Sequence, residues 1–159
     1  MSMSSDTKAR LEREMESMKK DNSPSGITVD QIIVNDNVQW TVIFQGEKRT
    51  AFEGFRFEGR LHFPNDYPTG APRLFFTRNI FHPYVCPVTG LYNDEVNWTS
   101  ESTVSTYLES AHQVLNFPLN HKRAVFNPHA YRLFVADQQV FSKIVEGHLE
   151  DDDTIITVD

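Results

Sequence analysis

Residues 55–76 restrict the fold more than any other stretch, because a long alternating pattern is followed there by closely spaced prolines. In 55–63, apolar residues alternate with charged and polar ones; the apolar set is Phe55, Phe57, Leu61 and Phe63, and the polar set is Arg56, Glu58, Arg60 and His62. Successive side chains of a strand point to opposite faces, so this pattern predicts a strand with one apolar and one wet face. Pro64, Pro68 and Pro72 fix φ and remove amide donors, so the chain must leave the sheet in a stiff turn.

Three more strands are predicted around this one. Before it, 27–34 and 38–45 alternate, with turn residues at Asn35-Asp36-Asn37 between them. After it, Leu74-Phe75-Phe76 forms a short strand. Successive short strands of this kind favour an antiparallel four-stranded meander with one apolar face. A first helix, capped by Asp6 and carrying a stripe of Leu11, Met15 and Met18, is positioned to cover that face.

The second half of the chain predicts a long loop and then helices. Residues 79–98 have no regular period, and such a loop inside a compact domain is usually functional. Apolar residues at helical spacing predict a helix from about 104 to 115. Asn127-Pro128 begins a last helix that Gly147 is expected to end. We therefore expect a single α+β domain at 6–149, a flexible N-terminus at 1–5 and a mobile acidic tail at 150–159.

Composition narrows the class of function. The net charge of −7 argues against a nucleic-acid partner, and no apolar stretch is long enough to span a membrane. One cysteine permits no internal disulfide, which favours a reducing compartment, the cytoplasm or the nucleus. The histidines of the helical half are scattered, so neither a metal site nor a cofactor is expected; they are His112, His121, His129 and His148. Protein partners remain as the main expectation.

Several motifs resemble the ubiquitin-conjugating (UBC) enzyme family. From about Leu11 to Val145 the order of elements is similar, and residues 57–68 read F-x-G-x-L-x-F-P-x-D-Y-P. The similarity continues through Ile80-Phe81-His82-Pro83, Trp98 with the helix after it, and Asn127-Pro128-His129-Ala130. The resemblance implies the UBC fold: an N-terminal helix, a four-stranded antiparallel meander, an irregular loop and C-terminal helices.

The resemblance also shows which catalytic residues differ. Active members use a cysteine thiolate to carry the ubiquitin C-terminus, and the asparagine of a His-Pro-Asn motif lies near the transfer centre. Here the motif ends in Tyr84 instead of asparagine. Eight residues further, where the family has its cysteine, stands Tyr92, and counting back from Trp98 gives Gly90 instead. A tyrosine has a pKa near 10 and is a poor carrier for reversible acyl transfer.

Cys86 is the one thiol in the chain and keeps an active alternative open. For Cys86 to act as the thioester nucleophile, the loop would have to move it about six residues, roughly 20 Å of extended chain, or refold around it. His82 is close in sequence, and Asp94 could orient it, so a Cys/His arrangement is conceivable. The competing interpretation is a small apolar residue in a loop.

Two further differences concern partner binding. Active members carry a large aromatic residue after Tyr-Pro and a Ser-Pro-Ala-like loop to bind ubiquitin ligases, whereas this chain has Thr69 and Thr99-Ser100-Glu101. The loop from His82 to Asp94 looks closest to the fused-toes-type inactive members, which act in multi-protein adaptors. It is also compatible with the inactive variants that pair with an active conjugating enzyme and position ubiquitin.

The main hypothesis is therefore a non-catalytic, UBC-like protein-binding module, and the alternative is an active conjugating enzyme that uses Cys86. Tyr84, Leu91 and Tyr92 are candidate partner anchors, because they are large side chains on an aperiodic loop. On this hypothesis Tyr92→Ala weakens partner capture and leaves the melting temperature nearly unchanged. Packing of the loop onto the domain is the other interpretation of these residues.

Overall fold

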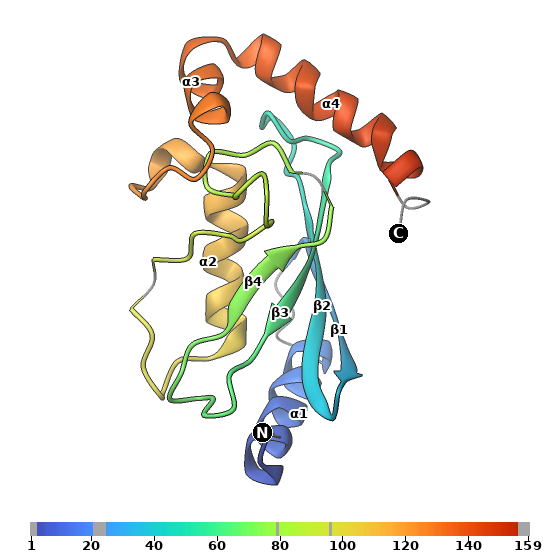
Figure 1. Cartoon of the computed structure of the whole chain (residues 1–159), viewed down its shortest axis with the longest axis vertical. Coiled ribbons are helices and arrows are strands. Elements are labelled where there is room, and N and C mark those ends of the chain that lie inside the picture. The colour runs from blue at the N-terminus through green and yellow to red at the C-terminus, as the bar shows by residue number, and fades with distance from the viewer. Residues whose placement is uncertain (1–2, 21–24, 79, 96, 156–159) are drawn as a thin grey trace.

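The computed structural model describes residues 3–20, 25–78, 80–95 and 97–155, and it has the α+β architecture predicted from the sequence (Figure 1). A helix is followed by a four-stranded sheet, a long connecting segment and further helices. The elements are α1 (Ser5–Lys20), β1 (Ile27–Val34), β2 (Asn37–Gln45), β3 (Arg56–His62), β4 (Arg73–Phe76), α2 (Val104–Asn116), the 3-10 turn η1 (Pro118–Asn120), α3 (Pro128–Ala136) and α4 (Gln138–Ile155).

The sheet is the predicted antiparallel meander, in the order β1-β2-β3-β4. Asn35 and Asp36 both have positive φ, 52° and 66°, and connect β1 to β2 in a tight hairpin turn. Trp40 pairs with Leu61 and Leu61 with Leu74, so three inward residues form one row across the sheet. All three have no exposed surface. The alternation in β3 is confirmed, since its apolar positions are buried and its polar positions face outward.

The apolar face is covered by two helices at different places. The long axis of α2 runs along the sheet, whereas α1 lies at the end where the N-terminus begins (Figure 1). The predicted stripe of α1, Leu11, Met15 and Met18, is buried. The α2 residue His112 stacks on Phe44 of β2, with ring centroids 6.2 Å apart. The prediction that the first helix covers the apolar face is therefore correct only in part.

The opposite end of the molecule is closed by α3, α4 and an aromatic cluster. Phe52, from the loop between β2 and β3, contacts Phe134 of α3 and Phe141 of α4, with ring centroids 6.3 and 5.4 Å apart. The sequence predicts one helix here, but the chain forms two. Asp137 separates them because its carboxylate accepts a hydrogen bond from the Val140 amide (3.2 Å) and so caps α4.

The start of α1 and the end of α4 both differ from the helix ends that the sequence predicts. Met3 is only 4% exposed, and the Ser4 side chain caps α1 by accepting from the Thr7 amide (3.1 Å), so Asp6 is not the cap. Gly147 lies inside α4, which continues to Ile155, because a helical glycine costs only about 1 kcal/mol. Residues 1–2 and 156–159 of the predicted termini lie outside the described residues.

Candidate functional site

The loop after β4 is better ordered than its aperiodic sequence predicts. It turns back on itself as a small hairpin, in which the Cys86 amide donates to the Leu91 carbonyl (2.9 Å) and Val85 is bridged to Tyr92. This hairpin also extends the sheet, because the Tyr92 amide donates to the Leu74 carbonyl of β4 (3.0 Å). The segment that carries the candidate site is therefore attached to the core by backbone hydrogen bonds.

Gly90 has a structural role in this attachment. Its carbonyl accepts from the Phe76 amide (2.8 Å), and its φ is +80°. A Cβ atom at this position would lie 2.3 Å from the Phe76 carbonyl oxygen. Because only glycine combines positive φ with so close a backbone approach, one of the two positions counted for the family's cysteine is closed to any side chain.

Tyr92, the other counted position, is a core residue. It is 2% exposed, its ring makes an edge contact with Phe76, and the Arg123 guanidinium lies 6.0 Å from its ring centroid. Burial raises the pKa of its hydroxyl far above the ordinary value of 10. The hydroxyl has no hydrogen-bond partner among the described residues. Tyr92 can therefore neither ionise near neutral pH to act as a nucleophile nor reach a partner surface.

Tyr84, at the position of the family's asparagine, is also committed to the fold. It is 2% exposed, and its hydroxyl lies 2.8 Å from the His121 carbonyl and 3.2 Å from the Pro118 carbonyl, to which it donates. A phenol has one proton, and here that proton holds the η1 segment against the loop. Pairing with β4 and contact with η1 bury the rings of Tyr84 and Tyr92, so for these two residues the structure favours packing of the loop onto the domain over the role of partner anchors. Leu91 is partly exposed.

His82 is fully buried, and both of its ring nitrogens are hydrogen bonded. Nδ1 accepts from the Tyr84 backbone amide (3.0 Å), so Nε2 carries the proton and donates to the Leu115 carbonyl (2.9 Å). The Asp94 carboxylate instead accepts from the Tyr107 hydroxyl (3.1 Å). The conceivable Cys86–His82–Asp94 arrangement is therefore absent among these residues.

Acid should destabilise the protein through His82. Desolvation lowers the pKa of its imidazole from 6.5 to about 4 in the folded chain. Between these two pH values the unfolded chain binds a proton that the folded chain excludes, so stability is complete above pH 6.5 and falls as the pH drops toward 4. The expected loss is about 3 kcal/mol. Denaturant titrations across this range check it.

The control for the pH experiment is His82→Gln, which removes the titrating group. This variant should be less stable than the wild type at pH 7, because the buried hydrogen bonds are disturbed, but its stability should decline less on acidification. An equal decline in both proteins would show that other groups cause the acid sensitivity.

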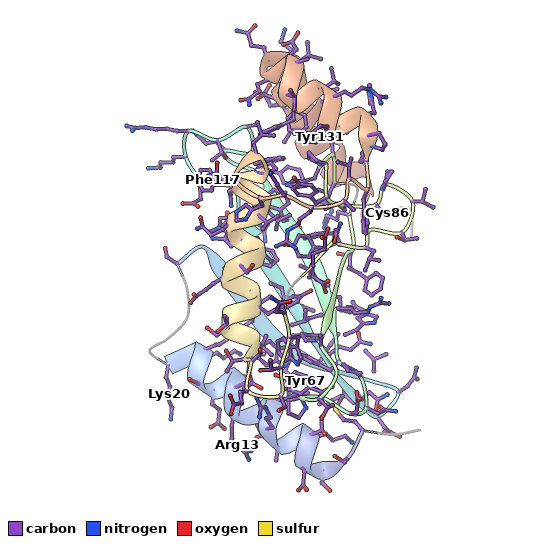
Figure 2. All side chains as sticks on the ribbon, turned by 90° about the vertical axis from the view of Figure 1, so that its left-hand side faces the viewer. Arg13, Lys20, Tyr67, Cys86, Phe117 and Tyr131 are labelled. Carbon is purple, nitrogen blue, oxygen red and sulfur yellow. The ribbon has the colours of Figure 1, made fainter. Side chains whose placement is uncertain are left out.

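Cys86 is partly exposed and lies at the tip of the hairpin (Figure 2). Its carbonyl accepts from the Gly90 amide (2.9 Å), and the residue lines a hollow of about 330 Å³ beside Thr77 and Arg78. Hydrogen bonds from the Thr89 side chain and from the Thr89 and Val88 amides lower the pKa of the thiol. Thr89 is a residue that sequence reasoning missed; its position three residues after Cys86 in a proline-containing turn is the signal that could have found it.

The hairpin changes the distance argument about Cys86. Because the chain folds back, residue 86 lies directly beside residue 91, and the predicted separation of roughly 20 Å along an extended chain does not apply. Side chains alternate along the hairpin, however: Val85 and Tyr92 are buried, whereas Cys86 and Leu91 are partly exposed. The thiol therefore faces away from Tyr92 and from the interior.

The region where active family members bind ligases is exposed but polar. Trp98 joins its two loops, because its indole Nε1 donates to the Pro68 carbonyl (2.7 Å). Thr69 and the 99–101 segment are exposed, as a docking surface would require. Neither loop presents a large apolar side chain, so the typical anchor of such an interface is missing there.

Comparison with known proteins connects this geometry to a family. A family model described as ubiquitin-conjugating enzyme matches residues 10–149. The chain belongs to this family. A solved structure titled "Novel Ubiquitin-Conjugating Enzyme" superimposes with a TM-score of 0.74 at 27% identity, covering 86% of this chain and 90% of that chain.

Relatives within the ubiquitin-conjugating enzyme family match to different extents. Ubiquitin-conjugating enzyme E2 2 of Yarrowia lipolytica is 30% identical over 151 residues, which cover 93% of this chain and 97% of the relative. Ubiquitin-conjugating enzyme E2 of African swine fever virus is 32% identical over 100 residues, 55% of this chain and 46% of that protein. The chain thus spans about half the length of several relatives that it matches.

As a member of the ubiquitin-conjugating enzyme family, the chain has the N-terminal helix, the four-stranded antiparallel sheet and the C-terminal helices of the UBC-like fold. In the part of the chain that the structure describes, no three His, Cys, Asp or Glu side chains gather as metal ligands do. No described helix combines the length and the apolar character needed to cross a bilayer.

Proposed function

We propose that this member of the family is non-catalytic and acts as a protein-binding module, either as the cofactor of an active conjugating enzyme or as a subunit of an adaptor complex. The observation that carries the proposal is that neither position counted for the family's cysteine holds a thiol: Tyr92 is buried, 2% exposed, and Gly90 has no room for a side chain. The proposed protein partner is ubiquitin, an active conjugating enzyme or an adaptor subunit.

The chemistry of acyl transfer supports this proposal. A thioester needs a thiolate that the incoming ubiquitin C-terminus can reach, and its transfer needs a donor for the oxyanion. Tyr92 is buried and closed to substrate. Tyr84, at the position of the family's asparagine, donates its one proton to the backbone of η1 and the residue after it. Both residues pack in the fold, so each has a structural role that does not involve transfer.

One observation favours the alternative, an active enzyme that uses Cys86. The thiol is partly exposed, lines a hollow, and has a lowered pKa because Thr89 and its neighbours donate hydrogen bonds to it. A lowered pKa increases the thiolate fraction at neutral pH. His82 is unavailable to assist, however, since both ring nitrogens bind backbone groups.

The two functions are separated by a charging assay. The full chain is incubated with ubiquitin, activating enzyme and ATP, beside a known active conjugating enzyme, and resolved on a non-reducing gel. We expect no ATP-dependent adduct on this chain and a reductant-sensitive adduct on the active enzyme.

Cys86→Ala is the matched variant for this assay, and omission of ATP controls for disulfide formation, which a reactive thiol also undergoes. An adduct that requires ATP and the activating enzyme, is removed by reductant and is absent from Cys86→Ala would overturn the proposal in favour of the enzyme.

A further inference from the structure

Exposed apolar side chains gather at the end of the molecule opposite α1. Phe117 and Leu119, on either side of Pro118, are 36% and 52% exposed, and Tyr131 and Val135, one turn apart on α3, are 36% and 55% exposed. Figure 2 shows Phe117 and Tyr131 at the same end, far from Tyr67 and α1. Large apolar side chains that gather on a surface mark an interaction site more often than single ones do.

A groove runs through this region. It has a volume of about 210 Å³ and is lined by residues 49–51 of the loop between β2 and β3, by residues 116–120, and by Phe134 and Gln138. We call it the η1 groove. Its walls come from three separate segments, which Phe52 and the α3–α4 pair hold in place by aromatic contacts. The lining is therefore mixed, with apolar and polar side chains in equal number; the apolar ones are Ala51, Phe117, Pro118, Leu119 and Phe134.

Charge around the η1 groove favours an acidic occupant. Arg49 is the one charged residue that lines it; its side chain is exposed and forms no salt bridge among the described residues. The adjoining segments add exposed cations, which are Lys48, Lys122 and Arg132. Three carboxylates lie on the same segments, Glu47, Glu53 and Asp137, and they keep their charge although Glu53 accepts from the Arg49 amide (2.7 Å) and Asp137 from the Val140 amide (3.2 Å). With Arg123 included, the cations of these segments outnumber the carboxylates. This basic setting contrasts with the net charge of −7 for the whole chain.

The backbone of the groove favours a helical occupant. The amides of Thr50, Phe117 and Asn120 all donate to carbonyls of this chain, at 3.3, 2.9 and 3.1 Å. These lining segments therefore offer no ladder of free donors with which an extended peptide could pair. A helix satisfies its own backbone groups and presents only side chains, which suits a groove whose lining amides are already hydrogen bonded.

We propose that the η1 groove binds an amphipathic helix of a partner protein, with apolar side chains in the groove and carboxylates facing Arg49 and its neighbouring cations. This inference rests on the proposed binding function and adds to it the place and the chemistry of the partner. Leu119 and Phe117 supply the apolar contacts, and Arg49 orients the helix by its charge.

The probe is a synthetic, fluorescently labelled helical peptide with leucines at i, i+4 and i+7 flanked by glutamates. Two matched peptides replace the glutamates with lysines or place a proline in the middle. Fluorescence anisotropy with the full chain should detect the acidic helix, and binding of the lysine and proline peptides should be at least about tenfold weaker.

Variants of the chain locate the binding. Leu119→Asp should weaken binding of the acidic helix at least about tenfold, and Arg49→Glu severalfold, without changing the melting temperature, since both side chains are exposed. Val88→Asp is the matched control, because Val88 is 89% exposed and lies on the Cys86 hairpin, outside the η1 groove. This variant should bind the acidic helix as tightly as the wild type does.

Each other outcome overturns the inference: no binding of the acidic helix, equal binding of the lysine or proline peptide, or equal loss in the Val88 control. A dimer in sedimentation experiments that Leu119→Asp dissociates would assign the groove to a second copy of this chain. If the acidic helix does not bind, the groove proposal fails, and the binding function would belong to another surface. If ubiquitin is charged onto Cys86, the non-catalytic function fails, and the result of the peptide titration is unaffected.

Discussion

Replacing Tyr92 with alanine is expected to lower the free energy of unfolding by about 3–5 kcal/mol. The ring is 2% exposed and packs against Phe76 and Arg123, so its loss leaves a cavity between the hairpin and the sheet. The sequence alone suggested a nearly unchanged melting temperature, and burial of the ring reverses that expectation. Denaturant unfolding monitored by fluorescence and circular dichroism gives the measurement.

Two matched variants control this prediction. Tyr92→Phe keeps the ring and removes a hydroxyl that has no partner among the described residues. Its free energy of unfolding should equal that of the wild type or exceed it by up to about 1 kcal/mol. Val88→Ala on the same hairpin, at a side chain that is 89% exposed, should change stability by less than about 0.5 kcal/mol. A Tyr92→Ala variant as stable as the Val88 variant would show that the ring is not part of the core.

Replacing Gly90 with alanine should lower the free energy of unfolding by about 3 kcal/mol or more. The residue has φ +80°, and an added Cβ would lie 2.3 Å from the Phe76 carbonyl oxygen, which the sheet holds in place. Strain at positive φ and a backbone clash therefore add. Thermal or denaturant unfolding measures the sum.

Gly54→Ala separates these two causes. Gly54 has nearly the same φ, +82°, and nothing lies within 4 Å of its added Cβ. Its variant should lose only the cost of positive φ, about 1 kcal/mol. The difference between the two variants then measures the contact between Gly90 and β4, and equal losses would mean that the hairpin moves aside freely.

The fold was predictable wherever one face of an element is buried. The alternation in 55–63 and the stripe of Leu11, Met15 and Met18 follow directly from burial on one side, and both are observed. Helix ends were less predictable, because their caps depend on weak local preferences. Gly147 has nothing within 4 Å of its added Cβ and is accommodated inside α4, although glycine often ends a helix.

The candidate site was harder to predict, because its order comes from tertiary contacts. Residues 79–98 have no period in the sequence. In the described part of this range, residues 85–92 form a short hairpin against β4 and Tyr84 contacts η1, so no regular element sets the pattern. Tyr84 and Tyr92 therefore suggested exposed anchors in the sequence and are buried in the structure. The sequence identifies which residues stand at the counted positions, whereas their roles depend on tertiary contacts that no sequence pattern reveals.

The residues at the positions counted for the family's asparagine and cysteine all make contacts that stabilise the fold. The position of the asparagine now donates a hydrogen bond that joins the loop to η1, and the two positions counted for the cysteine hold the hairpin on β4. Tyr67 shows the same stabilising use of a phenol elsewhere, since its hydroxyl donates to the Glu14 carboxylate at 2.6 Å. The loop retains its place in the fold, and its side chains contribute stability there.

The most direct test of the non-catalytic account is the intact mass of the wild-type chain after incubation with ubiquitin, activating enzyme and ATP, because mass detects attachment at any residue. The account predicts an unchanged mass while an active conjugating enzyme in the same reaction gains ubiquitin. A chain whose mass increases by one ubiquitin, in a bond that reductant cleaves, would contradict it.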